Sequence, residues 1–513
     1  MAELLFILCV VASAIAFAIS TIKFLHFFQL NSYRGKIHSK WIAKNPSKWI
    51  ANLAGGAMLI FLALWNGHGA QLIYLILSVV LILLSFPKKA KKPLVYTMRV
   101  KRLIATTFIV MVLLTIGGYT LGATCAVMGS LFMVAPAFVM VANLINRTME
   151  LAITNYYIND AKKMLASSNA RVIGITGSYG KTSVKYYLST LLKAKYNVLM
   201  TPESYNTPMG VVLTIRSSLN ALHDIFVCEM GAKRVGEIKE ICDIVHPEMG
   251  VITSVGPQHL ETFKSLDNVK KTKFELADSL PENGLLFLNG DDENINSYKG
   301  NKQNISYSVT GKGSYIASDV MMNEKGTHFT VTSPDGEKAE FVTKLIGMHN
   351  VLNITGAIAI ANTLGIELTK LRTQVLKLEA VPHRLELIKK GNDLIIDDAY
   401  NSNPNGTKAA LKTLSFFDGM KILLTPGMVE LGAKQAELNE EFGENAAKVC
   451  DYVILVDKHQ TEPIYKGLKK AGYSDDKIYV AKDFSDAISH AYALNSMGKR
   501  KIILLENDLP DNY

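Results

Sequence analysis

Long apolar segments dominate the first 145 residues, and they restrict the fold more than any other feature of the chain. A membrane-spanning helix needs roughly 17–25 mostly apolar residues. Five segments are at or near that length, at residues 3–22, 49–65, 70–86, 103–121 and 125–145. The first lacks the basic start and the cleavage site of a signal peptide. We therefore expect a membrane domain of about five transmembrane helices over residues 1–148; the alternative for any single segment is a kinked helix or a buried helix of a soluble domain.

Two basic loops between these segments predict the orientation. Residues 31–48 carry five Lys and Arg, residues 87–102 carry seven, and the two short turns at 66–69 and near Gly122 carry none. Basic loops stay in the cytoplasm. With five spans, the N-terminus is then extracytoplasmic and everything after about residue 147 is cytoplasmic. The sequence thus predicts a multi-pass protein of the cell membrane, with the lipid bilayer as a partner.

The formal net charge of +10 is a possible sign of nucleic-acid binding, but its distribution argues against that. Residues 1–150 hold 14 Lys and Arg against two acidic residues, whereas residues 151–513 hold 41 against 43. The basic excess therefore belongs to the membrane part, where it sets topology and contacts anionic lipid. We expect no nucleic-acid partner. Five Cys in 513 residues also exclude a disulfide-stapled fold.

A glycine-rich loop opens the remaining part of the chain. Residues 171–176 have the β-branched, apolar pattern of a buried parallel strand, and a helical pattern runs to about residue 194. A glycine-rich turn between such a strand and helix is typical of a phosphate-binding loop. In that motif, backbone N–H groups and the helix N-terminus face the phosphate, a lysine supplies positive charge, and a hydroxyl binds Mg²⁺. Ile175 stands where the longer form of this motif has Gly. The alternative is a structural turn. The predicted nucleotide-binding residues are Thr176, Gly177, Ser178, Gly180, Lys181, Thr182 and Ser183.

Further polar residues follow predicted strands. Residues 225–228 form a short apolar run that ends at Glu229. A carboxylate at the end of a parallel strand, beside a phosphate-binding loop, is a usual place for Mg²⁺. The apolar run 250–255 leads to His259, and Lys273 lies on the next predicted helix. Taken alone, a His or a Lys at such a position is more often a solvent-exposed side chain than a ligand.

The order of the motifs resembles the Mur ligase family, most closely its MurF-type members, which add D-alanyl-D-alanine to a peptidoglycan precursor. The resemblance covers about residues 165–510. The matching motifs are 176–182, 206–210, 229–231, 256–261, Lys273, 288–292, 347–350, 381–386, 397–404 and 427–432. It implies an α/β body with a P-loop-type central ATP-binding domain at 165–345 and a Rossmann-like C-terminal domain at 346–513.

The alternation of apolar and polar residues agrees with that architecture. Strands are expected at residues 393–397, 421–425, 452–456, 478–480 and 501–505. Helices are expected at 405–415 and 434–449, and a small antiparallel piece within 310–345. This pattern predicts a C-terminal sheet flanked by helices.

The resemblance implies an ATP-dependent ligase that joins a carboxylate to an amine through an acyl-phosphate, in cell-wall (peptidoglycan) precursor synthesis. The implied cofactors are ATP and two Mg²⁺ ions. By resemblance, Lys181 contacts the β- and γ-phosphates, Thr182 and Glu229 hold one Mg²⁺, and His259 helps to hold the second. Lys273 matches a lysine that the family carbamylates, which would make it an anion near the second ion; the alternative is an unmodified lysine in a salt bridge.

The resemblance assigns the other candidate residues to ATP and to the molecules that the enzyme joins. Asn289 and Asn350 fall where the family approaches the adenine, and Asp398 falls where it contacts the nucleotide. Arg384, at the hinge into the last domain, would reach the γ-phosphate on domain closure. Turn formation is the alternative for the loop residues. The tentative substrate-binding residues are Asn206, Tyr400, Asn401 and Asn403.

Three departures leave both substrates open. The family's UDP-binding first domain is absent and the apolar helices stand in its place. A basic Lys-Gly-Ser-Arg-like loop near the end is replaced by Glu506-Asn507-Asp508, and His383 replaces a usual Gly. The donor is therefore a UDP-linked or a lipid-linked precursor, the acceptor is an amine or peptide, and membrane-bound cell-wall enzymes are candidate partners.

Other function classes fit less well. A poly-γ-glutamate or folylpolyglutamate-type ligase shares the phosphate loop, but motifs 397–404 and 427–432 favour the MurF type. The MurT type carries a zinc ribbon, and this chain has no Cys-x-x-Cys. A transporter would need ionisable residues within its spans. A non-catalytic scaffold would have no need for five intact site residues.

Overall fold

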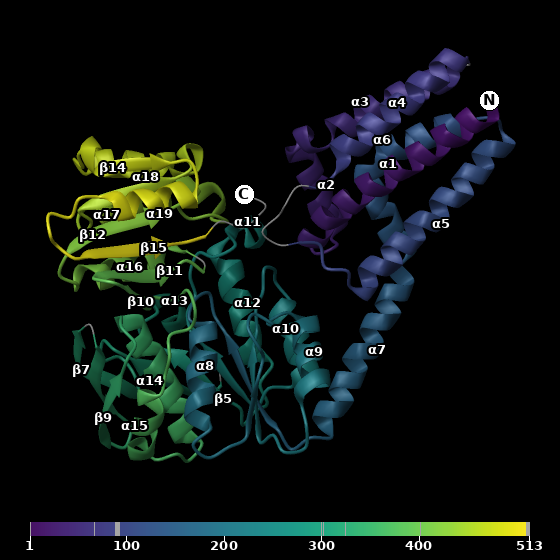
Figure 1. The fold of residues 1–513 in the computed structure, drawn as a ribbon. Coiled ribbons are helices and arrows are strands. Elements are labelled where there is room, and N and C mark those ends of the chain that lie inside the picture. The colour runs from purple at the N-terminus through teal and green to yellow at the C-terminus, as the bar shows by residue number, and fades with distance from the viewer. Residues whose placement is uncertain are drawn as a thin grey trace. The chain divides into compact units, whose positions relative to one another are not determined.

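The structure is a computed structural model that describes residues 2–65, 67–87, 93–298, 300, 302–323, 325–400 and 402–508. Contacts within the chain separate two compact units, Met1–Tyr156 and Tyr157–Pro510 (Figure 1). The first is helical and the second is α/β.

The first unit consists of apolar helices. They are α1 (Ala2–Leu30), α2 (Gly35–Lys44), the 3₁₀ turn η1 (Pro46–Lys48), α3 (Ile50–Leu64), α4 (His68–Ser85), α5 (Met98–Thr120), α6 (Thr124–Ile145) and α7 (Arg147–Ala166), which runs into the second unit. Among the described residues, four helices are long and apolar enough to cross a membrane: α1, α4, α5 and α6. The second of the five expected segments forms α3, which at 15 residues is shorter than that length.

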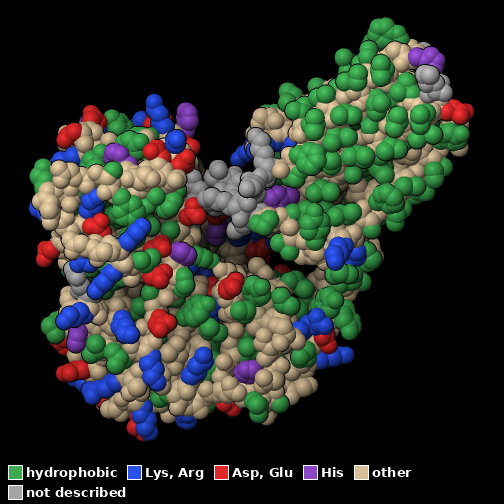
Figure 2. Space-filling view, in the orientation of Figure 1, with side chains coloured by type: hydrophobic (Ala, Val, Ile, Leu, Met, Phe, Trp, Pro, Cys, Tyr) green, Lys and Arg blue, Asp and Glu red, His purple; other side chains and the backbone are tan. Residues whose placement is uncertain are grey.

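Close backbone packing and buried polar contacts hold these helices together. A Cβ atom on Gly56 of α3 would lie 2.8 Å from the Met133 Cα of α6, so only glycine allows this approach. Asn52 Nδ2, buried on α3, donates to Ser20 Oγ at 2.6 Å and to the Phe132 carbonyl at 3.2 Å. Apolar side chains cover most of the visible outer face of this unit (Figure 2).

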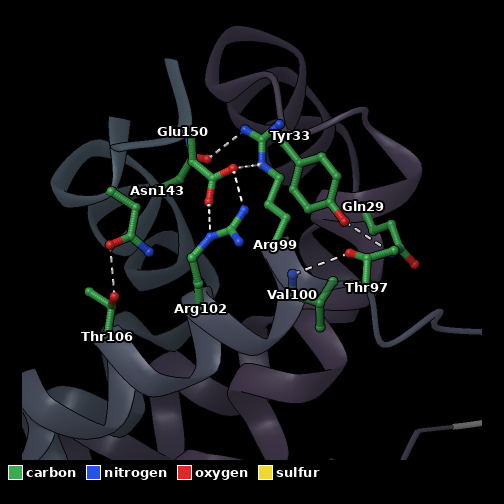
Figure 3. Close-up of polar contacts among 10 residues, drawn as sticks. Gln29, Tyr33, Thr97, Arg99, Val100, Arg102, Thr106, Asn143 and Glu150 are labelled. Atoms are coloured by element: carbon green, nitrogen blue, oxygen red, sulfur yellow. Dashed lines mark hydrogen bonds and ion pairs between the residues drawn. The ribbon is translucent and has the colours of Figure 1, made fainter. Parts of the chain in front are cut away.

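A charged cluster joins α5 to the first turn of α7 (Figure 3). Arg102 Nε and Nη2 donate to the two carboxylate oxygens of Glu150 at 2.6 and 2.9 Å. Arg99 lies 3.9 Å from the same carboxylate, donates to Asn143 Oδ1 at 3.0 Å, and stacks 4.2 Å from the centre of the Tyr33 ring. Glu150 therefore faces two arginines with one negative charge and links the start of α7 to α5.

We expect Glu150→Ala to destabilise the helical unit by about 1–2 kcal/mol, because it removes a two-point charged contact that is only partly screened by water. The Arg102 side chain is 24% exposed, so the loss stays below that of a fully buried pair. Thermal unfolding of the full chain in detergent measures it. Glu3→Ala is the matched control, since Glu3 is the other acidic residue of the first 150 and is exposed; equal shifts for both variants would contradict the prediction.

The second unit is built first around a nine-stranded sheet in the order β2-β3-β1-β4-β5-β6-β7-β8-β9. Strands β2 to β6 and β1 pair in parallel, β7 joins β6 in parallel, and β7–β8–β9 are antiparallel, as expected within 310–345. The strands are β1 (Arg171–Thr176), β2 (Val198–Met200), β3 (Ile225–Glu229), β4 (Met249–Ile252), β5 (Leu285–Asn289), β6 (Asn304–Ser308), β7 (Tyr315–Asn323), β8 (Gly326–Thr332) and β9 (Lys338–Thr343).

Helices cover both faces of this sheet, so β1 is buried on both sides. The helices are α8 (Lys181–Leu192), α9 (Pro208–Ser218), α10 (Glu237–Val245), α11 (Leu260–Phe263), α12 (Leu266–Asp278), α13 (Glu293–Asn296), α14 (Met348–Thr363) and α15 (Leu368–Leu376). Ile173 and Ile175 pack against α8 and α14, whereas Val172 packs against α9 and α10. This core extends to Leu378, past the expected boundary at residue 345; the sequence-based boundary stays a prediction.

A second, six-stranded sheet follows, in the order β10-β11-β15-β12-β13-β14, with β10 antiparallel to β11 and the rest parallel. Its strands are β10 (Glu386–Lys390), β11 (Asp393–Asp398), β12 (Met420–Thr425), β13 (Tyr452–Val456), β14 (Ile478–Ala481) and β15 (Lys501–Glu506). Its helices and turns are α16 (Pro404–Ser415), η2 (Gly432–Lys434), α17 (Gln435–Ala447), α18 (Lys458–Lys470), η3 (Asp475–Lys477) and α19 (Phe484–Ala493). The five expected strands are present, β10 is additional, and the α/β body is confirmed.

Candidate active site

The loop between β1 and α8 is shaped by two glycines. Gly177 has φ +154°, and a Cβ atom there would overlap Thr253 Oγ1 and lie 2.9 Å from the Ser254 nitrogen. Gly180 has φ +82° and caps α8. Ser178 ties the loop down by donating to the Gly256 carbonyl at 3.0 Å. These positions keep the backbone close around the helix N-terminus, a cradle that fits a phosphate group.

Lys181 is folded back over this cradle. Its Nζ donates to the carbonyls of Gly177 at 2.6 Å and Ser178 at 3.1 Å. Burial lowers the pKa of Lys181 to about 8, Glu229 opposes that shift, and Arg384 adds to it. The Lys181 ammonium thus lies at the start of α8, where the oxygens of a bound phosphate could replace these two carbonyls as its hydrogen-bond acceptors.

Thr182 and Glu229 lie side by side at the end of β3. Thr182 Oγ1 donates to Glu229 Oε1 at 3.2 Å, and Asn206 Nδ2 donates to the same oxygen at 2.9 Å. Burial acts to raise the pKa of Glu229, but the ammonium groups of Lys185 and Lys181 outweigh it and hold the pKa below its usual value. A hydroxyl and an ionised carboxylate are the hard oxygen ligands that Mg²⁺ prefers, so this pair fits one ion.

His259 contacts a residue that the sequence did not assign. Its Nδ1 is hydrogen-bonded to Glu430 Oε2, and Lys233 Nζ lies 3.6 Å from Glu430 Oε1. Burial lowers the pKa of His259, with Glu430 opposing, while the bond to His259 lowers the pKa of Glu430 to about 2. Among the described residues, no group of three or more His, Cys, Asp or Glu is arranged to hold a metal. Mg²⁺ is commonly held by one or two protein oxygens together with phosphate oxygens and water.

Lys273 is buried on α12, where the carboxylates of Glu275 and Glu237 act on it without direct contact. Within the described residues it has neither an ion pair nor a hydrogen bond, and so the expected alternative of a salt-bridged lysine finds no partner there. Glu275, two residues on, is engaged instead with the backbone of Gly236 and Lys239. Burial, with Lys181 nearby, holds the pKa of Lys273 well below its usual value. A neutral, buried amine is reactive toward CO₂.

The hinge into the second sheet brings a further set of charged groups together. The Arg384 guanidinium stacks 4.5 Å from the centre of the Tyr400 ring, and its buried Nε has no partner in the described part of the chain. The Leu385 N–H donates to Asp398 Oδ1 at 3.2 Å. Burial raises the pKa of Asp398, with Arg384 opposing, and raises that of Glu506 beside it. Glu506 accepts a bond from Ser402 Oγ at 2.7 Å.

Comparison with known proteins identifies the fold that carries these groups. Residues 175–361 match the Mur ligase middle domain, and residues 383–506 match the Mur ligase, glutamate ligase domain. The two matches together cover more than half of the chain. The chain belongs to the Mur ligase family.

The curated relatives and solved structures that this Mur ligase resembles include MurF proteins. It is 34% identical over 295 residues to the UDP-N-acetylmuramoyl-tripeptide--D-alanyl-D-alanine ligase of Escherichia coli, covering 56% of this chain and 65% of that protein. It is 34% identical to the same-named Bacillus subtilis protein, covering 58% and 63%. The Thermotoga maritima MurF, solved with ADP, superposes with a TM-score of 0.62 at 27% identity, covering 69% and 80%. The chain spans somewhat less than two thirds of the curated relatives' length.

The other expected nucleotide-binding residues of this Mur ligase make internal contacts. Thr176 Oγ1 donates to the Met230 carbonyl at 3.0 Å, and Ser183 is buried in the first turn of α8. Asn289 Nδ2 donates to the Thr253 carbonyl at 2.9 Å. Asn350 accepts from Tyr187 and donates to the Ile346 carbonyl. These bonds fix the strand and helix ends around the phosphate loop.

The tentative substrate residues divide into three groups. Asn206 lies against Glu229, and the Tyr400 hydroxyl is hydrogen-bonded to Ser204, so both face the centre of the site. Asn403 is engaged as the N-cap of α16, accepting from the Gly406 N–H at 2.8 Å. Asn401 lies outside the described residues. His383, the departure before Arg384, has φ +60° and is paired through Nδ1 with Asp397 Oδ2 at 2.8 Å.

We expect Gly177→Ala to reduce ADP affinity by more than tenfold, because the added Cβ collides with Thr253 and Ser254 and deforms the cradle. Calorimetric titration of the full chain with ADP measures this. Gly336→Ala is the control: Gly336 also has a positive φ, but open space surrounds its Cβ position. That variant should lose some stability and keep its ADP affinity; unchanged ADP affinity in Gly177→Ala would contradict the assignment.

Proposed function

We propose that this Mur ligase uses ATP to join a carboxylate to an amine in cell-wall precursor synthesis, as a MurF-type enzyme does. The observation that carries the proposal is the convergence, at one edge of the first sheet, of a phosphate cradle, the Thr182–Glu229 pair and the unpartnered amine of Lys273. The MurF names of the curated relatives support the acid–amine class and D-alanyl-D-alanine as the acceptor.

The reaction proceeds in two balanced steps. A carboxylate oxygen of the donor takes the γ-phosphoryl group of ATP, which releases ADP and leaves an acyl-phosphate. The amine nitrogen of the acceptor then forms a bond to the acyl carbon, phosphate leaves, and a proton is lost from nitrogen. Both steps bring several negatively charged oxygen atoms close together. The residues of the site therefore contribute mainly by positioning the reactants and neutralising this charge.

Named residues supply these effects. Lys181, released from the carbonyls of Gly177 and Ser178, places its ammonium against the β- and γ-phosphates. Arg384, whose Nε lacks a partner among the described residues, is available to the γ-phosphate. Thr182 and Glu229 would hold one Mg²⁺, which would neutralise phosphate charge. His259, now hydrogen-bonded to Glu430, would help to hold a second ion.

Lys273 is proposed to be carbamylated. The deprotonated nitrogen attacks the carbon of CO₂, one proton is lost from nitrogen to solvent, and the neutral amine becomes a carbamate anion. The burial of Lys273 and the lack of an ion pair to it among the described residues support this, because a buried ammonium without a direct partner is unfavourable. The anion would help to organise the second Mg²⁺.

The helical unit is proposed to anchor the enzyme in the cell membrane. Four helices of sufficient length and the apolar outer surface support this. We place the basic segments and the ligase unit in the cytoplasm and the N-terminus outside. This unit lies outside the two segments that match the Mur ligase domain models, and we take its apolar helices as support for a lipid-linked or membrane-proximal donor.

Amine-dependent ADP release by the full chain in detergent tests the function. We expect release with D-alanyl-D-alanine and a muramyl-tripeptide donor, and a faster rate when that donor is lipid-linked than when it is UDP-linked. Equal rates for the two donors would remove the lipid-linked hypothesis. Bound ADP with no amine-dependent release from either donor would overturn the ligase function.

A further inference from the structure

Lys185 is a second buried lysine of the phosphate-loop helix, one turn beyond Lys181. Its side chain is 0% exposed, and its Nζ lies 3.0 Å from Glu229 Oε2, on a side chain that is 2% exposed. None of the roles proposed above uses it. A lysine is rarely fully buried unless its charge is paired. The Glu229 carboxylate forms that ion pair with Lys185.

The two carboxylate oxygens of Glu229 have different partners. Oε1 receives the Thr182 hydroxyl and the Asn206 amide at 3.2 and 2.9 Å. Oε2 accepts no directed hydrogen bond in the described structure and faces Lys185 as an ion pair. Oε1 thus lies beside the Thr182 hydroxyl, and Oε2 lies against the Lys185 ammonium.

Lys185 also holds the loop that follows β2. Its Nζ donates to the Glu203 carbonyl at 2.5 Å, and Glu203 has a positive φ of 39°. Asn206, three residues on, contacts Glu229, and Ser204 contacts Tyr400 from the second sheet. One ammonium group thus fixes both the carboxylate and the loop that lies against it.

We propose that Lys185 is a positioning residue of the magnesium site: it holds Glu229 Oε2 and the Glu203 carbonyl so that Glu229 binds Mg²⁺ through Oε1 alone, beside Thr182. The proposal rests on the proposed function only for the identity of the ion and nucleotide. Without Lys185 the Glu229 carboxylate would lose the ion pair that holds Oε2 and would keep only the hydrogen bonds to Oε1.

The test is calorimetric titration of ADP into the full chain, with Mg²⁺ and with EDTA. Wild type should bind ADP more tightly with Mg²⁺. Lys185→Met should lose at least tenfold in affinity with Mg²⁺ and less than about threefold in EDTA. Lys185→Gln, smaller and still polar, repeats the test if the first variant does not fold. Lys501→Met is the matched control, because the Lys501 ammonium is buried and donates to the carbonyls of Ala491 and Tyr492 in the last turn of α19. It should behave as wild type.

A double variant decides whether Lys185 acts through Glu229. Glu229→Gln should lose the Mg²⁺ effect, and Lys185→Met combined with Glu229→Gln should lose no more. Additive losses, or a full Mg²⁺ effect in Lys185→Met or in a folded Lys185→Gln variant, would overturn the proposal. Wild type that binds ADP with the Mg²⁺ effect but shows no ligase activity would overturn the proposed function and leave the positioning role standing; wild type that binds no ADP would overturn both.

Discussion

Lys181→Ala should reduce amine-dependent ADP release about 10³-fold, the largest effect expected from a single side chain here. Loss of one preorganised charged group from a phosphoryl-transfer site costs roughly 10²–10³ in rate, and Lys181 is the cation built into the cradle itself. Initial rates of ADP release at saturating ATP measure it.

Lys193→Ala is the control for that experiment, because Lys193 lies exposed just past the end of the same helix. Its rate should stay within about twofold of wild type, as for surface substitutions in general. A Lys181→Ala variant that keeps more than a tenth of the wild-type rate would show that the cradle is not the site of phosphoryl transfer.

Lys273→Ala should reduce turnover by about 10²-fold, because it removes both the buried amine and the carbamate that we propose forms on it. Wild type incubated with ¹³C-bicarbonate should show a carbamate carbon resonance that Lys273→Ala lacks. Activity of Lys273→Ala should be partly restored by a small carboxylic acid, which can place a carboxylate in the vacated space.

Lys271→Ala provides the matched comparison, since Lys271 is exposed on the same helix. It should keep both the ¹³C resonance and the rate. The carbamylation hypothesis would be abandoned if wild type gave no carbamate signal while turning over normally. Normal turnover by Lys273→Ala would remove Lys273 from the site altogether.

Much of the second unit could be predicted because its sequence follows simple periodicity. The β-branched run 171–176 forms β1, and all five strands expected after residue 392 are present. Strand β10 was missed because residues 386–390 are partly exposed and include two lysines. Residues 206–210 indicated a loop, whereas Thr207 caps α9 and Pro208 opens it.

The contacts that complete the site could not be predicted from local sequence. Glu430 lies 171 residues from His259, and no spacing rule connects them. Lys185 resembles a solvated helix lysine until Glu229, 44 positions away, is placed beside it. Local patterns identified the loop and its strand ends, and the tertiary fold supplied the counter-charges.

The length of α3 shows a similar limit. Residues 49–65 are as apolar as the other segments, but η1 precedes the helix and the Trp49 indole donates to the Ile42 carbonyl at 2.9 Å. The helix therefore begins at Ile50 and has 15 residues. A membrane span in this segment stays a prediction.

The mass of the product formed by the full chain, reconstituted in lipid with ATP, Mg²⁺, a cell-wall precursor extract and D-alanyl-D-alanine, tests the central claim most directly. The ligase account predicts a new species whose mass equals precursor plus dipeptide minus one water, formed with one ADP per product and absent in Lys181→Ala. ADP formation without any such species, or no ADP formation at all, would contradict it.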